Sequence, residues 1–507
     1  MAKATARAVY QNLGLALGPL LALPLLLWFD PDPGKPALGP IAAVVVLMAV
    51  WWVSEAIPMA ATAVLPMVLF PALGIAGPSK TAEAYMNSVI FLYVGGSLIA
   101  LAMERWNLHR RIALSITYRV GRRPESVVLG FLLATAFISM WISNVATTVM
   151  MLPIALAVIK KLEESFGADR VRPVSLAVLI GIAYASSIGG IATLIGTPTN
   201  LAFVKIFEQS FPNGPGISFG QWFLLGLPAS ILVLAATWLL LTRVAFRMPR
   251  DLRIDKEIVG RELRALGPPS YQERVVMAVG TITALLWVFR GDLVIGSFVL
   301  PGWARLWDGF ALVDDSTVGV AMGLLLFLIP ARGDNGKGIL EGSAFRQLPW
   351  DAILLFGGGF ALAGGFVSSG LTAWLAERFA GFTSVPVWLT VLLGCLGVAL
   401  VTEFVSNIAT VQMFLPVLAS LAIARGIHPL LLMVPTALTA GLAFMFPVGT
   451  PPNAVIFGSD RVKVFEMAWA GLFVKVVALA LTLGVCALLL PLVFQFDPGS
   501  MPDWARP

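Results

Sequence analysis

A short polar motif occurs twice in an otherwise apolar sequence, and this duplication limits what the chain can fold into. The motif is Ser143-Asn144-Val145-Ala146-Thr147 in the first half and Ser406-Asn407-Ile408-Ala409-Thr410 in the second, 263 residues later. A second pair follows, Gly196-Thr197-Pro198-Thr199-Asn200 and Gly449-Thr450-Pro451-Pro452-Asn453, 253 residues apart. The sequence therefore predicts an internal repeat with two polar breaks in each half.

Residues that interrupt helices gather at these four breaks. In lipid, a break that leaves backbone groups unpaired is tolerated only where it lines a protein-enclosed site. Matched breaks in two halves of a chain are typical of the substrate and ion site of a secondary transporter. Kinked helices that pack through small residues are the alternative, and two matched pairs of breaks argue against it.

The composition predicts an integral membrane protein. Hydrophobic residues make up 58% of the 507 residues and charged residues 12%, against about 25% charged residues in soluble domains. A net charge of +6 is compatible with binding to nucleic acid. However, the basic residues lie in the loops between apolar segments, where they indicate how the chain is oriented in the membrane. We expect no nucleic-acid partner. Two cysteines and two histidines argue against a disulfide framework or a metal centre of these residues, and we expect no organic cofactor.

Many segments approach the roughly 20 apolar residues that cross a bilayer. Nine segments are predicted full spans: 13–29, 38–58, 60–76, 89–103, 224–244, 275–289, 318–329, 352–368 and 467–494. Four more carry the breaks: 126–159, 174–207, 387–424 and 429–457. We expect an all-α polytopic membrane protein with about 11 transmembrane helices in two inverted repeats, each with a re-entrant hairpin and a broken helix.

The basic residues give the orientation. If 126–159 and 387–424 are re-entrant hairpins, twenty-five Lys and Arg residues lie on one side of the membrane and seven on the other. Cytoplasmic loops collect these residues, so we expect a cytoplasmic N-terminus and an extracytoplasmic C-terminus in a bacterial inner (plasma) membrane. The halves then have opposite topology, which brings the two Ser-Asn motifs together near the midplane.

The breaks offer neutral ligands for an anion and for a cation. Helix N-termini and Ser, Thr and Asn side chains can hold a small anion, and no Lys or Arg lies at a break. A bound anion needs countercharge, and co-bound sodium suits the carbonyl, hydroxyl and amide oxygens of such loops. Ser139 and Thr402 lie one helical turn before Ser143 and Ser406 and present hydroxyls on the same face. Hydrogen bonds to carbonyls one turn earlier are the alternative.

Four charged residues within or near apolar segments need an explanation. Glu55 and Glu403 are either proton or cation sites or structural caps. We expect Lys205 and Lys475 to extend to a membrane interface.

Together with Ser54-Glu55-Ala56-Ile57-Pro58 and Pro447 to Ala454, the motifs resemble those of the divalent anion/sodium symporters, which carry dicarboxylates, citrate or sulfate. The resemblance covers almost the whole chain. It implies a homodimer, two or more sodium ions, and elevator-type movement of a transport domain against a scaffold. The divisions are then 1–125 (mainly scaffold), 126–210 (first transport part), 211–245 (closing helix), 246–273 (cytoplasmic linker), 274–384 (second scaffold part), 385–460 (second transport part) and 461–507 (last helix and C-terminus).

The resemblance also assigns site residues. One sodium site takes Ser139, Ser143, Asn144 and the backbone near Gly196, and the other takes Thr402, Ser406, Asn407 and the backbone near Gly449. Substrate carboxylates meet Asn144, Ser406 and Asn407, with Thr450 and Pro451 nearby. Where the family has Ser-Asn-Thr, this chain has Val145 and Ile408. Two hydroxyls are therefore missing, and Thr197 and Thr450 are the candidates to replace them.

These observations predict a sodium-coupled symporter of a C4-dicarboxylate such as succinate, malate or fumarate. Sulfate, a larger di- or tricarboxylate, and sodium-independent exchange are the alternatives. A channel would need a continuous polar pore, and an intramembrane enzyme would need a nucleophile with a base or a metal cluster. The sequence pattern favours neither, and we expect no enzymatic activity.

Overall fold

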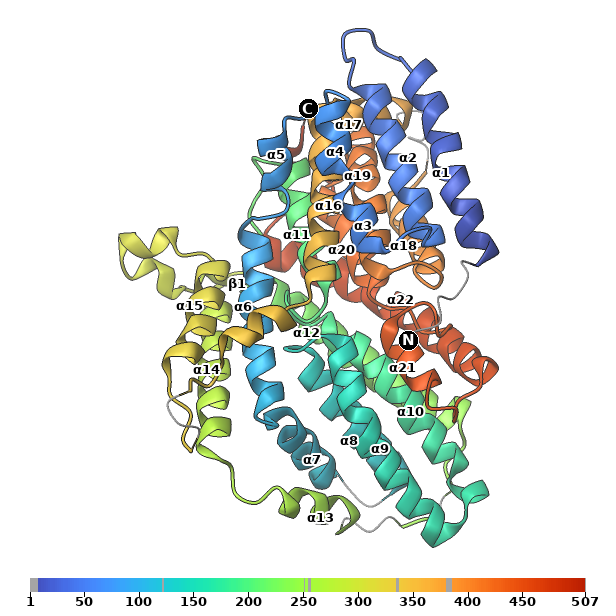
Figure 1. Ribbon diagram of the computed structural model, residues 1–507, viewed down its shortest axis with the longest axis vertical. Helices are drawn as coiled ribbons and strands as arrows, with labels where there is room; N and C mark the ends of the chain where they lie inside the picture. The colour runs from blue at the N-terminus through green and yellow to red at the C-terminus, as the bar shows by residue number, and fades with distance from the viewer. Residues whose placement is uncertain are drawn as a thin grey trace.

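Helices form nearly all of the regular structure in the computed structural model, which describes residues 8–120, 123–249, 251–253, 257–333, 337–379 and 385–506 (Figure 1). The helices of the first half are α1 (Val9–Trp28), α2 (Leu38–Ser54), α3 (Met59–Val64), α4 (Pro66–Ala72), α5 (Pro78–Glu83), α6 (Ser88–Arg105), α7 (Leu108–Val120), α8 (Pro124–Ser139), α9 (Asn144–Phe166), α10 (Ala168–Gly190), α11 (Pro198–Ser210) and α12 (Phe219–Leu239). A π-helical turn, Leu240–Ala245, extends α12, and α13 (Glu257–Ala265) lies in the predicted linker.

The second half repeats much of this order. Its helices are α14 (Tyr271–Val288), α15 (Asp315–Leu328), α16 (Trp350–Ser368), α17 (Leu371–Phe379), α18 (Val387–Val401), α19 (Asn407–Arg425), α20 (Pro429–Ala440), α21 (Pro451–Phe457) and α22 (Val464–Phe494). Short 3-10 turns occur at Trp303–Arg305, Asp308–Leu312, Gly342–Gln347 and Asp503–Ala505. The strands β1 (Leu293–Ile295) and β2 (Phe298–Leu300) form an antiparallel pair between α14 and α15.

The predicted fold class, an α-helical polytopic membrane protein, is confirmed. In the part of the chain that the structure describes, eight helices are long and apolar enough to cross a membrane. The predicted span 60–76 corresponds to most of α3 and all of α4, which only Leu65, with helical backbone, separates. Pro66 begins α4, and proline cannot donate the hydrogen bond that a continuous helix would need there. The total number of crossings and their orientation stay predictions, and residues 1–7 lie outside the described residues.

Each predicted break lies between two helices. A turn joins α8 to α9 and another joins α18 to α19, while α10 is separated from α11 and α20 from α21 by irregular segments. In Figure 1 the α8–α9 hairpin occupies the lower part of the molecule and α18–α19 the upper part, with α11 and α20 beside α18 and α19 and with α12 and α21 between the two hairpins. The four motifs therefore lie in the central region.

Around this region, the helices of each half pack both against one another and against helices of the other half. Within each half, the broken helix packs on its own hairpin, α10 on α8 and α9, and α20 on α18 and α19. Between the halves, α21 packs against α9 and α10, and α11 packs against α19 and α20. Each hairpin therefore contacts the broken helix of both halves.

Glycines permit close approach of other helices. A Cβ atom on Gly95 of α6 would lie 2.3 Å from the carbonyl carbon of Gly319 in α15. A Cβ atom on Gly358 of α16 would lie 2.4 Å from the carbonyl oxygen of Ala63 in α3. Small residues at such contacts are typical of helix packing in membranes.

Candidate anion and cation site

Each of the four motifs begins a helix. Asn144, Pro198, Asn407 and Pro451 are the first residues of α9, α11, α19 and α21. The preceding residues Ser143, Thr197, Ser406 and Thr450 occupy the N-cap positions with non-helical backbone. The first N–H groups of a helix have no partner within it and carry partial positive charge. The first residues of α9 and α19 offer such N–H groups, whereas Pro198, Pro451 and Pro452 have none, so α11 and α21 offer donors only from later residues of their first turns.

The motif residues differ in accessibility. Val145 is 38% exposed, and Pro451 is also exposed. Asn144, Ser406, Asn407 and Ile408 are half-buried. Thr197 and Thr450 are only 4% and 3% exposed. The hairpin tips are thus accessible to a ligand, whereas compensation by the two buried threonines stays a prediction.

Polar atoms of Asn144, Ser139, Gly196 and Ser186 gather at the first hairpin. Asn144 Oδ1 lies 2.8 Å from Ser139 Oγ and 3.1 Å from the carbonyl oxygens of both Gly196 and Ser186. A turned amide would place the Asn144 nitrogen here as a donor to all three. The turned amide satisfies all three acceptors, so the hydrogen-bond pattern favours the Asn144 nitrogen in this position. The structure therefore brings Ser139, Asn144 and Gly196 of the predicted sodium set together.

A similar cluster lies at the second hairpin. Thr402 Oγ1 lies 2.7 Å from Asn407 Oδ1 and 2.8 Å from the carbonyl oxygen of Ala440, the last residue of α20. The hydroxyl and amide are five residues apart in both halves, Ser139 with Asn144 and Thr402 with Asn407. The two clusters thus share a local geometry, and their assignment as sodium sites stays a prediction.

The remaining predicted sodium ligands have other contacts. The hydroxyl of Ser143 accepts the N–H of Ala146 at 3.3 Å as a helix cap. The carbonyl of Ser406 accepts the hydroxyl of Thr410 at 3.0 Å. Gly449 packs against the backbone of Glu403, which lies next to Thr402. No hydrogen bond joins these residues to the clusters among the described contacts.

Sequence reasoning missed several polar contacts at the breaks. The carbonyls of Ser186 and Ala440 face the clusters, and a backbone oxygen leaves no mark in a sequence. Trp222 Nε1 donates to the carbonyl of Ile191 at 3.1 Å, and Ser230 Oγ donates to that of Ile188 at 2.8 Å. These donors from α12 satisfy carbonyls of the α10–α11 break. Asn200 and Asn453, the last residues of the Gly-Thr-Pro motifs, could have been found from their place in the repeat.

The predicted position of Lys475 is wrong. Its side chain is 11% exposed and forms an ion pair with Glu403, which is 2% exposed. The carboxylate of Glu403 also accepts the N–H groups of Phe444 and Met445, so Lys475 points to a buried partner rather than to an interface. Glu55 is exposed, with a left-handed backbone at the C-terminal end of α2, which favours the structural-cap interpretation.

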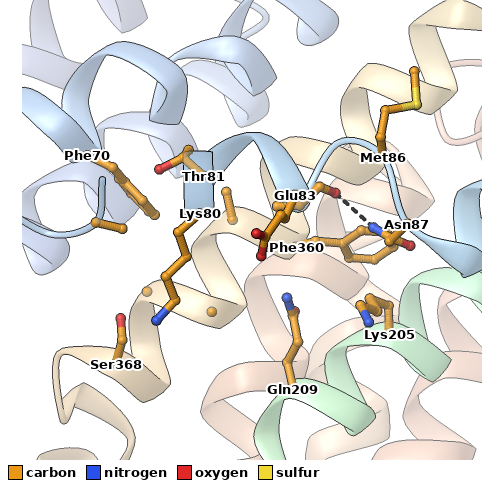
Figure 2. Close-up of a pocket in the computed structure, with 15 residues that line it drawn as sticks. Phe70, Lys80, Thr81, Glu83, Met86, Asn87, Lys205, Gln209, Phe360 and Ser368 are labelled. Atoms are coloured by element: carbon orange, nitrogen blue, oxygen red, sulfur yellow. Dashed lines mark hydrogen bonds between the residues drawn. The ribbon is translucent and has the colours of Figure 1, made fainter. Parts of the chain in front are cut away.

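A separate polar cavity of about 410 Å³ lies between α5, α11 and α16. Figure 2 shows Lys80, Lys205 and Gln209 extending their nitrogen atoms into it, opposite the carboxylate of Glu83. Lys205 is also paired with Glu208 at 3.2 Å. The cavity contains none of the site residues that the sequence predicts, and two carboxylates, Glu83 and Glu208, accompany its two lysines.

Hairpins from two halves, each packed against the broken helices of both halves, define a polytopic α-helical membrane transporter. Residues 13–495 match the family described as the sodium:sulfate symporter transmembrane region. The chain belongs to this family, as the motifs predicted, and its members are transporters rather than enzymes.

Curated relatives agree with this assignment. The chain is 40% identical over 497 residues to the sodium-dependent dicarboxylate transporter SdcS of Staphylococcus aureus strain MRSA252, covering 96% of this chain and 92% of the relative. SdcS of strain NCTC 8325 / PS 47 has the same identity and coverage.

Solved structures of more distant proteins share the fold. The Alcanivorax borkumensis YdaH transporter aligns with a TM-score of 0.55 and 14% identity over 97% of this chain and 100% of its own. Neisseria gonorrhoeae MtrF, from a class described as antimetabolite efflux pumps, aligns with a TM-score of 0.53 and 12% identity over 93% and 98%. At these identities the likeness concerns the fold alone.

Proposed function

We propose that this protein is a secondary active transporter that couples the inward sodium gradient to symport of a C4-dicarboxylate of the succinate, malate or fumarate type. The sodium-dependent dicarboxylate transport for which the SdcS relatives are named, at 40% identity over 96% of the chain, supports this assignment. The structural observation that carries it is that four helices begin at the matched motifs, each preceded by Ser or Thr, on hairpins and broken helices that pack against one another across the two halves. A dicarboxylate has two anionic ends, and paired sets of N–H donors match them.

Sodium coupling follows from the charge at this site. The four N-termini supply partial charges, and the nearby Lys475 is neutralised by Glu403. Co-bound cations would supply the countercharge that a divalent anion needs. The oxygen clusters at Asn144 and Asn407 are the proposed places for at least two sodium ions, since hydroxyl, amide and carbonyl oxygens are hard ligands.

The mechanism we propose is alternating access of the elevator type. The transport domain would comprise the parts 126–210 and 385–460, moving against scaffold helices from 1–125 and 274–384. The protein would act as a homodimer in a bacterial plasma membrane, with its N-terminus in the cytoplasm and its C-terminus outside. The interlocked packing of α21 on α9 and of α11 on α19 supports movement of the two hairpins as one body.

Sulfate is the second candidate substrate. The description of the matching family names sodium and sulfate as the transported ions. In addition, the exposed side chain of Val145 presents methyl groups where the family pattern has a hydroxyl. Sulfate carries two negative charges and four acceptor oxygens, as a dicarboxylate does, within a smaller volume. Larger di- or tricarboxylates and sodium-independent exchange remain outcomes of the same experiment.

Uptake of radiolabelled succinate into proteoliposomes tests the proposal. We expect uptake with an inward sodium gradient and none when potassium replaces sodium. Competition by sulfate, citrate and 2-oxoglutarate ranks the alternatives. Sodium-driven sulfate uptake without succinate uptake would overturn the dicarboxylate assignment, and succinate exchange without sodium would overturn the coupling.

A further inference from the structure

Glu403 and Lys475 form an ion pair between two segments that are 72 residues apart in the sequence. Glu403 lies in the turn between α18 and α19, directly after Thr402, and Lys475 lies in α22. Both side chains are buried, at 2% and 11% exposure. Charged residues inside membrane helices are rare because they are costly to place there, and they often mark a functional site.

The Glu403 carboxylate binds the backbone of the α20–α21 break. One oxygen accepts the N–H of Phe444 at 3.0 Å, and the other accepts the N–H of Met445 at 2.9 Å. At the far end of the break, a Cβ atom on Gly449 would lie 2.9 Å from the carbonyl oxygen of Glu403. Glu403 therefore binds the middle of the segment that joins α20 to α21 and packs against its far end.

This segment adjoins the second oxygen cluster. Thr402, the neighbour of Glu403, donates to the carbonyl of Ala440 at 2.8 Å and lies 2.7 Å from Asn407 Oδ1. Groups that hold the ligands of an ion determine where those ligands point, and such outer partners affect ion affinity. A displacement of the α20–α21 segment would move the oxygens of this cluster.

The last helix of each half, α12 or α22, packs on the break of the broken helix in the same half, and the contacts occur at equivalent positions. A Cβ atom on Gly226 of α12 would lie 2.6 Å from the carbonyl oxygen of Ile191, and one on Gly471 of α22 would lie 2.4 Å from that of Phe444. The two glycines are 245 residues apart, and the two carbonyls they face are 253 residues apart, which is the spacing of the Gly-Thr-Pro motifs.

With the two halves aligned by these spacings, the positions of the first half that correspond to Glu403 and Lys475 carry no charge. Ser230, 245 residues before Lys475, takes the place of the lysine, and its hydroxyl donates to the carbonyl of Ile188 at 2.8 Å. Met140, 263 residues before Glu403, takes the place of the glutamate. The two halves thus support equivalent breaks in chemically different ways.

We propose that Glu403 and Lys475 are positioning residues that set the sodium affinity of the second cation site. This inference rests on the proposed sodium-coupled function. Glu403 orders the segment beside Thr402 and Asn407, and Lys475 compensates the buried charge of Glu403. Removal of one partner alone leaves a buried uncompensated charge, so the informative variants change both residues.

The test uses the variant Glu403→Met with Lys475→Ser, which copies the first half. We expect it to fold and to need about tenfold more sodium for half-maximal succinate uptake. The maximal rate at saturating sodium and succinate should fall far less. Thermal unfolding of the purified protein gives a readout other than transport. Since a bound ion stabilises the folded state, the variant should need correspondingly more sodium for the same rise in the unfolding midpoint.

A second variant and a control keep the test decisive. Glu403→Gln with Lys475→Met retains one acceptor for the break, and we expect a smaller increase in the sodium requirement. If the first variant does not fold, this one replaces it. The control is Arg172→Gln with Glu466→Gln, which removes an ion pair of 2.6 Å whose side chains are 48% and 20% exposed, and its sodium dependence should match the wild type.

The outcomes separate this inference from the proposed function. Sodium-independent uptake by the wild type would overturn the proposed function itself. Sodium-dependent wild-type uptake, combined with a wild-type sodium requirement in a folded double variant, would overturn only the positioning role. If the double variant lowers the uptake rate by the same factor at every sodium concentration, its sodium requirement is unchanged. That result would also overturn the positioning role.

Discussion

Asn200 and Asn453 make the same pair of hydrogen bonds in the two halves of the protein. Each side-chain nitrogen donates to the carbonyl oxygens ten and seven residues earlier. The acceptors are Gly190 and Thr193 for Asn200, at 3.2 and 2.7 Å, and Ala443 and Phe446 for Asn453, at 3.4 and 3.0 Å. The last residue of each Gly-Thr-Pro motif therefore closes the break that precedes it.

Asn200→Ala and Asn453→Ala should each destabilise the protein. Both substitutions leave two carbonyl oxygens without this donor, and an unsatisfied buried polar group costs about 1–3 kcal/mol. Because the contacts are equivalent, we expect losses of similar size in the two variants. The measurement is the thermal unfolding midpoint of the purified protein in sodium.

Asn213→Ala is the matched control, since Asn213 is exposed in the loop before α12. Its midpoint should equal that of the wild type. Wild-type midpoints in both Asn200→Ala and Asn453→Ala would contradict the closing role, because the carbonyls would then have found other donors.

The sequence predicts the breaks well because their cause is local. Proline is favoured at the first position of a helix, where its missing N–H has no partner to lose, so Pro198 and Pro451 mark the starts of α11 and α21, although Pro153 and Pro416 lie inside α9 and α19. The duplication adds a second constraint on the prediction, because two copies of a motif at corresponding positions are expected to adopt the same structure. The pairing of Ser139 with Asn144, within one hairpin, is predictable for the same reason.

Contacts between distant segments could not be predicted. Lys475 was expected at an interface because a lone lysine in an apolar helix usually extends to one, and its partner Glu403 is 72 residues away in the sequence. The β1–β2 pair was missed because two three-residue strands carry little pattern.

Asn144→Ala and Asn407→Ala should abolish transport without unfolding the protein. Each amide belongs to an oxygen cluster and to a hairpin tip that is half-buried rather than enclosed. We expect succinate uptake to fall by about 100-fold, with an unchanged elution volume on size exclusion. Asn12→Ala, at an exposed position of α1, is the control and should transport normally. Normal uptake by either hairpin variant would show that the substituted hairpin tip does not belong to the transport site.

The ion pair of Glu341 with Arg105 predicts a small acid-sensitive contribution to stability. The hydrogen bond from Arg105 lowers the pKa of the Glu341 carboxyl, and this outweighs the opposing effect of burial. A lowered pKa in the folded state means that the contribution is present above the unfolded pKa of about 4.3 and is lost as the pH falls through the folded pKa.

Glu341→Gln should therefore lower the unfolding midpoint slightly at neutral pH, and the difference from the wild type should disappear in acid. The measurement is a series of midpoints for both proteins from about pH 7 to about pH 3. A difference that stays constant over this range would show that the carboxyl acts through packing rather than charge.

Val145→Thr with Ile408→Thr should increase the affinity for dicarboxylate. The substitutions add hydroxyls at the starts of α9 and α19, where Val145 is 38% exposed and within reach of a ligand. One hydrogen bond to a charged group contributes about 1.5–3 kcal/mol, so even one new contact should lower the half-saturating succinate concentration roughly tenfold.

Val149→Thr is the control for this variant, since Val149 is 51% exposed one turn further along α9. It adds a hydroxyl to the same helix away from the tip, and the affinity should not change. An unchanged succinate affinity in the tip variant would show that other donors already occupy the place of the missing hydroxyls. A gain for succinate together with a loss for sulfate would instead identify Val145 and Ile408 as the residues that choose between the two anions.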